Sequence, residues 1–110
     1  FVCTAEDEVC IMDEGSGTCQ AGASCTMNDG QLTCEAGSTC TGEDAQLICL
    51  AGSECTHRVS GAGVTSTGST TCKAGATCTG TVSTGGVHTM NCEEGSVCSC
   101  SASTGGQCIW

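Results

Sequence analysis

The chain has 110 residues, a formal net charge of −10, and only one Phe and one Trp as aromatic core formers. Its two basic residues, Arg58 and Lys73, argue against nucleic acid and anionic membranes as partners, and no stretch approaches the roughly 20 apolar residues of a membrane span. The 14 cysteines, an even number, are typical of an oxidising compartment, so we expect a secreted, extracellular protein.

The first residues, Phe1 and Val2, run directly into Cys3 with no apolar segment ahead of them. Phe1 is therefore expected to be a mature N-terminus. Ten of the twelve acidic residues lie at or before Glu54, so the first half of the chain carries the net charge.

A repeated unit, Cys-x-x-Gly-x-x-Cys, dominates the chain and occurs at Cys19–Cys25, Cys34–Cys40, Cys49–Cys55, Cys72–Cys78 and Cys92–Cys98. Cys3–Cys10 is a degenerate first copy, one residue longer and without the glycine, as terminal repeats often are. The pattern predicts a single repeat domain over residues 1–110, with units that begin near residues 3, 19, 34, 49, 72 and 92.

The spacers between units predict β-structure. Early units repeat every 15 residues, with turn signals such as Asn28-Asp29-Gly30 between β-prone residues, whereas the later spacers Thr56–Thr71 and Thr79–Asn91 are longer. Two all-β architectures fit: a β-solenoid with one unit per coil, or a spine of Cys-x5-Cys loops from which hairpins project. We favour a small disulfide-stapled, β-solenoid-like stack with β-hairpins inserted at the longer spacers, which would place His57 and His88 on the surface.

The cysteine spacing favours disulfides within units. Each full unit keeps five residues between its cysteines, while the spacers vary from one to 16 residues, so the constant loop is the better candidate for closure. Pairing between stacked units, such as Cys25 with Cys34, is the alternative. The predicted bonds are Cys3–Cys10, Cys19–Cys25, Cys34–Cys40, Cys49–Cys55, Cys72–Cys78, Cys92–Cys98 and Cys100–Cys108.

The Cys-x5-Cys staple, recurring once per coil, resembles that of the small beetle antifreeze proteins, whose narrow β-helices are filled by disulfides within coils. Arrays of Cys-x-x-Gly-x-x-Cys are also similar to those of secreted, cysteine-rich bacterial repeat proteins. The likeness is one of spacing and implies an architecture. Ice binding would need a regular Thr-x-Thr face, but the threonines read as single columns, at Thr26, Thr41, Thr56 and Thr79 after the second cysteine and at Thr18, Thr33 and Thr71 before the first.

Acidic residues form another column, at equivalent places in three consecutive units: Asp13, Glu14, Asn28, Asp29, Glu43 and Asp44. Stacked carboxylates repel, and a calcium cofactor would relieve the repulsion with its preference for six to eight oxygen ligands. A solvated acidic turn is the favoured alternative.

The cysteines and histidines lack the spacing of a zinc site. The sequence also shows no nucleophile with a base and no paired carboxylates in a cleft, so we do not expect an enzyme.

These observations favour a secreted structural protein that self-associates, as the subunit of an extracellular filament or coat. The apolar extremes Phe1, Val2, Ile109 and Trp110 contain both aromatic residues and are expected to join copies of the chain head to tail. Two alternatives stay open: ice binding, and a calcium-dependent or carbohydrate surface-binding module.

Overall fold

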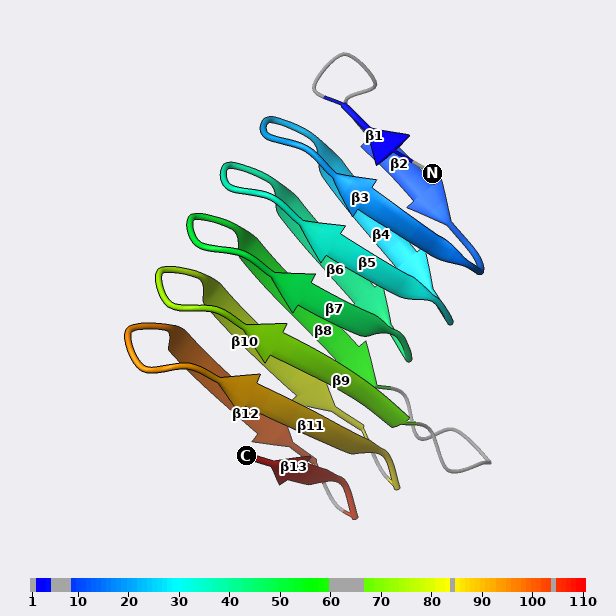
Figure 1. Cartoon of the computed structure of the whole chain (residues 1–110). Coiled ribbons are helices and arrows are strands. Elements are labelled where there is room, and N and C mark those ends of the chain that lie inside the picture. The colour runs from blue at the N-terminus through cyan, green and yellow to red at the C-terminus, as the bar shows by residue number, and fades with distance from the viewer. Residues whose placement is uncertain (1, 5–8, 60–66, 84, 104) are drawn as a thin grey trace.

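The structure, a computed structural model, describes residues 2–4, 9–59, 67–83, 85–103 and 105–110. Over these residues the chain alternates between two parallel sheets, so that each coil contributes one strand to each sheet (Figure 1). Sheet A consists of β1 (Val2–Cys3), β3 (Ser16–Cys19), β5 (Gln31–Cys34), β7 (Gln46–Cys49), β9 (Thr67–Cys72), β11 (Val87–Cys92) and β13 (Gln107–Ile109). Sheet B consists of β2 (Val9–Met12), β4 (Ser24–Asn28), β6 (Thr39–Glu43), β8 (Glu54–Val59), β10 (Thr77–Val82) and β12 (Val97–Ala102).

Alternation along each strand decides what is buried. In β4, for example, Cys25 and Met27 point into the space between the sheets, whereas Ser24, Thr26 and Asn28 point outward. Strands of neighbouring coils pair in register, and in sheet A cysteine stands beside cysteine from Cys3 to Cys92. The chain is therefore an all-β, disulfide-stapled solenoid, which confirms the fold predicted from the repeat.

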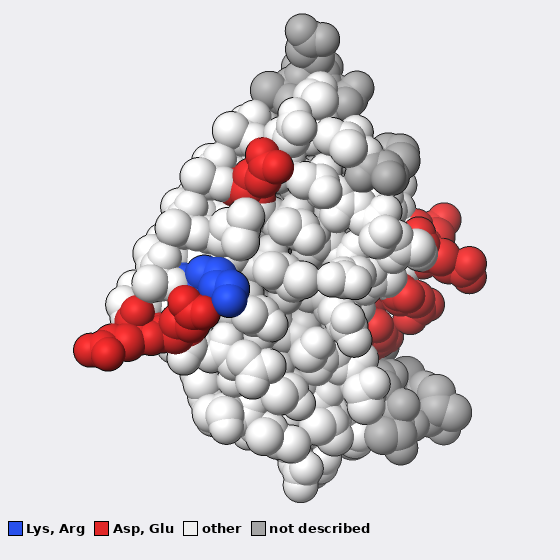
Figure 2. Space-filling view, in the orientation of Figure 1, with Lys and Arg blue, Asp and Glu red and all other residues white. Residues whose placement is uncertain are grey.

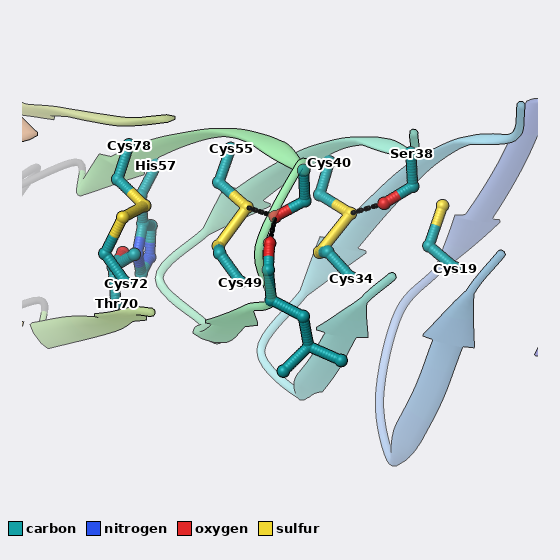
Figure 3. The surroundings of a disulfide bond; sticks show 12 residues. Cys19, Cys34, Ser38, Cys40, Cys49, Cys55, His57, Thr70, Cys72 and Cys78 are labelled. Carbon is teal, nitrogen blue, oxygen red and sulfur yellow. Dashed lines mark hydrogen bonds between the residues drawn. A yellow bond between two sulfur atoms is a disulfide. The ribbon is translucent and has the colours of Figure 1, made fainter. Parts of the chain in front are cut away.

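The disulfides bridge the two sheets inside each coil. Six of them cross the Cys-x-x-Gly-x-x-Cys corner or its longer first copy, and the seventh joins β12 to β13; their Cα–Cα distances are 6.1 to 6.7 Å. Figure 3 shows three successive bonds, Cys34–Cys40, Cys49–Cys55 and Cys72–Cys78. The seven pairs are those expected from the spacing. The first six form one column along the corner side of the core, and Cys100–Cys108 lies beside His88 and Gly80 of the preceding coil.

The glycine of each corner has a positive φ, which favours glycine because it has no Cβ. Gly52, at φ +88°, also donates its N–H to the carbonyl of Gly75 at 3.0 Å, one step of a ladder that runs up the corners. A Cβ on Gly52 would lie 3.1 Å from the Cβ of Ala36 in the coil below. The corner glycine therefore allows both the turn and the close stacking of coils.

Farther along the strands from the corner disulfides, large side chains in the core face glycines. A Cβ on Gly42 would lie 3.0 Å from Leu47, and one on Gly80 would lie 2.4 Å from the ring of His88. Both Leu47 and His88 are buried. Because each glycine leaves room for the large side chain opposite it, the two sheets can pack closely although the chain has few aliphatic residues.

The longer spacers do not form the predicted hairpins in the part of the chain that the structure describes. The second spacer instead lengthens β10 and β11 to six residues each, and these strands pair in parallel with neighbouring coils in opposite sheets. Residues 60–66 of the first spacer lie outside the described residues. The prediction that His57 and His88 lie on the surface is also wrong, because the wider coils turn both side chains into the core, with no exposed surface.

Substitution of the corner glycine tests this account of the stacking. We expect Gly52→Ala to destabilise the protein by more than the ~1 to 2 kcal/mol that a positive φ costs an L residue, because its Cβ also meets Ala36. Gly15→Ala is the matched control, since Gly15 has φ +89° but no atom within 4 Å of an added Cβ. Denaturant unfolding of the oxidised proteins measures both; equal losses would contradict the stacking argument.

Candidate functional surfaces

The outer face of sheet B carries two rows of side chains, one on each side of the buried cysteine column. The post-cysteine row runs in register through Ile11, Thr26, Thr41, Thr56, Thr79 and Ser99. The pre-cysteine row runs through Val9, Ser24, Thr39, Glu54, Thr77 and Val97. The two rows give six coils with paired outward positions, three of them occupied only by Ser and Thr.

This double row differs from the single threonine columns read in the sequence. The missed signal is the residue before the second cysteine, because Thr39-Cys40-Thr41 and Thr77-Cys78-Thr79 each place two threonines on the same side of a strand. Strand spacing sets a repeat of about 4.8 Å along the stack, and alternate residues along a strand lie about 6.6 Å apart. The face thus presents a regular array of hydroxyl and methyl groups, interrupted by Glu54.

The acidic candidates for a calcium site lie together on one edge of the stack. Asp29 and Asp44 occupy turns at positive φ, 61° and 53°, and the backbone N–H of Asp29 donates to the carbonyl of Glu43 at 3.2 Å. The other candidates, Asp13, Glu14 and Asn28, lie on the same edge. Figure 2 shows acidic side chains at one margin of the molecule, and a further acidic group beside a basic side chain at the opposite margin.

Two neighbours reduce the repulsion in this column without an ion. The amide of Asn28 donates a hydrogen bond to Asp13 Oδ1 at 3.2 Å, and the pairing of β6 with β8 places Arg58 directly beside Glu43. Within the described residues, the one group of three potential metal ligands closer than 4.8 Å is Cys34, Cys49 and Cys55, which are all in disulfides. Calcium binding at this edge stays a prediction.

A buried polar chain occupies the core of the wider coils. The backbone N–H of Ala45 donates to His57 Nε2 at 3.2 Å, and Thr70 Oγ1 lies 2.9 Å from both His57 Nδ1 and His88 Nε2. Because a backbone N–H can only donate, Nε2 of His57 must accept and its proton lies on Nδ1. Thr70 then accepts from His57 and donates to His88, whose remaining N–H points to Cys100 Sγ at 3.9 Å.

This chain requires both imidazoles to be neutral. Burial lowers the pKa of His57 to about 3, with a further contribution from His88, whose ring centroid is 4.4 Å away. Burial alone lowers the pKa of His88 to about 4. A second proton on His57 would also displace the Ala45 hydrogen bond. The pair therefore acts as a structural element of the core at neutral pH.

Acid should destabilise the fold through this pair. Both folded-state pKa values lie below the unfolded value of 6.5, so the stabilisation is fully present above that pH and is lost as pH falls toward 3. By linkage, protonation of each histidine should lower the free energy of unfolding by about 2 kcal/mol between pH 7 and pH 5. We expect His57→Gln/His88→Gln, which keeps neutral hydrogen-bonding groups, to remove most of this slope in denaturant melts at the two pH values. An unchanged slope in the double variant would contradict the assignment.

The predicted self-association residues lie at opposite ends of the stack. Val2 on β1 is 53% exposed, and Ile109 and Trp110 at the far end are 47% and 64% exposed. Phe1 lies outside the described residues. The structure adds three exposed apolar side chains on the end coils, Val9 and Ile11 on β2 and Val97 on β12.

Comparison with protein-family models, with curated proteins and with solved structures finds no match for this chain. The part of the chain that the structure describes contains no helix with the length and hydropathy needed to cross a membrane. Seven disulfides and no free cysteine in that part indicate an oxidising environment. Function must therefore be argued from the surfaces themselves.

Proposed function

We propose that the protein is a secreted structural subunit that self-associates end to end into an extracellular filament or coat. One observation carries the proposal: every large apolar side chain that is exposed among the described residues lies on the first coil or at the far end of the stack. The middle coils expose none. Such clustering of apolar surface marks interaction sites, whereas scattered exposed residues do not.

The strand edges at these ends support the same contact. β1 and β2 at one end, and β12 and β13 at the other, each have a neighbour on only one side within the described residues. Because every strand pair in the stack is parallel and in register, a second copy placed end-on presents edges of matching direction. The end coils thus combine open edges with exposed apolar side chains.

Charge favours a head-to-tail over a head-to-head arrangement. The acidic half of one copy then meets the nearly neutral half of the next, because ten of the twelve acidic residues lie at or before Glu54. Contact between two different surfaces does not close on itself unless a rotation brings it into a ring, so repetition yields a filament. The disulfides accord with the extracellular location.

Sedimentation of the oxidised chain over a range of concentrations tests the proposal. We expect large species whose size grows with concentration, and a loss of these species in Ile109→Ser/Trp110→Ser. Leu50→Ser, an equivalent apolar-to-polar change at a corner in the middle of the stack, is the control and should leave them intact. Filaments in negative-stain images would agree, whereas absence of any concentration-dependent growth in the intact chain would contradict end-to-end assembly.

A second candidate, ice binding, is favoured by the double row on sheet B. Regular hydroxyl and methyl groups on a flat face can order water over a large area, and the paired rows of Thr39, Thr41, Thr77 and Thr79 supply such groups in register. Side chains held by a stapled sheet lose little conformational entropy on binding a solid surface.

Thermal hysteresis of the purified protein tests this candidate. We expect activity that falls at least several-fold in Thr41→Lys, because a long cation in the middle of the face prevents flat contact. Gln20→Lys adds the same charge at a corner and should retain activity. No hysteresis at millimolar protein would rule ice binding out without affecting the assembly proposal.

A further inference from the structure

The outer face of sheet A carries no charged residue over the described strands, although the chain has a net charge of −10. Figure 2 views the molecule from this side and shows the charged side chains toward its margins, where the turns lie. Sheet B differs, because Glu43, Glu54 and Arg58 point outward from its strands. Sheet A is thus the broad surface on which an acidic protein can be approached without burying charge.

The outward positions of sheet A form two regular rows. One row is β-branched over five coils, in the register Val2, Thr18, Thr33, Ile48 and Thr71. The other row runs through Ser16, Gln31, Gln46, Ser69 and Thr89. Identical or similar side chains stacked in register are the surfaces that pack as dry, interdigitated sheet pairs, with glutamine ladders adding hydrogen bonds.

We propose that sheet A is the interface for a second copy of this chain, packed face to face about a two-fold axis. The contact uses one surface patch twice, so the β-branched row of each copy meets the same type of surface on the other. Sheets packed in this way lie about 10 Å apart, close enough for methyl groups to interdigitate. This lateral contact is distinct from the end-to-end contact proposed above, although Val2 and Ile109 belong to both surfaces.

The size of the face suffices for a specific dimer. Each outward residue covers about 32 Å² of a sheet with 4.8 Å and 6.6 Å repeats, and about 15 such residues on sheet A give about 1,000 Å² for the two copies together. That area is near the lower bound for a specific interface, and charged groups are depleted from interface cores as they are from this face. A weak, reversible dimer is therefore expected.

Charge also selects the orientation. An axis parallel to the stack places the acidic edge of each copy, with Asp29 and Asp44, over the corner edge of the other, which carries fewer carboxylates and where Lys73 forms an ion pair with Glu93 at 2.9 Å. An axis along the strands would instead place the two acidic edges against each other and bring like charges together. The dimer should therefore have parallel stacks and antiparallel strands across the interface.

Light scattering coupled to size exclusion tests the proposal in the Trp110→Ser background, which removes the end-contact aromatic residue that lies outside the strands of sheet A. We expect a mass near twice the 10.8 kDa of one chain at high concentration. Thr33→Lys, in the middle of sheet A, should reduce the mass to that of one chain, while Thr41→Lys on sheet B should leave the dimer. Circular dichroism before and after reduction checks that each variant folds; Gln46→Lys in the second row replaces Thr33→Lys if that variant does not fold.

Three results would overturn the pairing. One is a single-chain mass in the background variant at every concentration. Another is a dimer that survives both Thr33→Lys and Gln46→Lys. The third is a single-chain mass together with thermal hysteresis that Thr33→Lys abolishes, which would assign sheet A to ice instead. Loss of filaments in the background variant with retention of the dimer separates this proposal from the end-to-end one.

Discussion

The disulfide that joins the two sheets inside each coil is the constraint on which the rest of the structure depends. A chain with so few aromatic and long aliphatic residues cannot hold two sheets together by apolar burial alone. Each short closed loop contributes about 2 to 3 kcal/mol in the chain-entropy view, and there are seven. The bond also fixes where each coil turns. Because every coil turns at the same place, its neighbours can stack in register.

Because the coils stack regularly, the register of the cysteine column also sets the register of the side chains on the outer faces. Residues next to a cysteine must point outward, and they fall into rows because the cysteines themselves are in register. The double row of sheet B and the uncharged rows of sheet A are both consequences of this register. Among the described residues, the charged side chains lie on the turns and on part of sheet B. The surfaces proposed for assembly and for surface binding therefore derive from the same disulfide-set register.

Much of the fold is predictable because its strongest signal is covalent and periodic. Constant Cys-x5-Cys loops among variable spacers indicate the disulfide pairs, and a glycine at one place in each loop indicates a corner with positive φ. The wider coils are harder to predict, since Gly, Ser and Thr rich spacers suit both hairpins and longer strands. His57 and His88 resemble surface residues until the glycines opposite them, Gly68 and Gly80, are known to make room in the core. The row before the second cysteine is visible in the sequence only when the alternation of strands is applied across the cysteine.

Disulfide mapping of the unreduced chain tests the central claim most directly. Cleavage after glutamate under denaturing conditions cuts between Cys34 and Cys40 and releases residues 36–43 with Cys40 as their one cysteine. Closure within coils predicts that this peptide is linked to residues 15–35, which contain Cys34. A link from residues 36–43 to residues 44–54, which contain Cys49, would show pairing between coils and contradict the account.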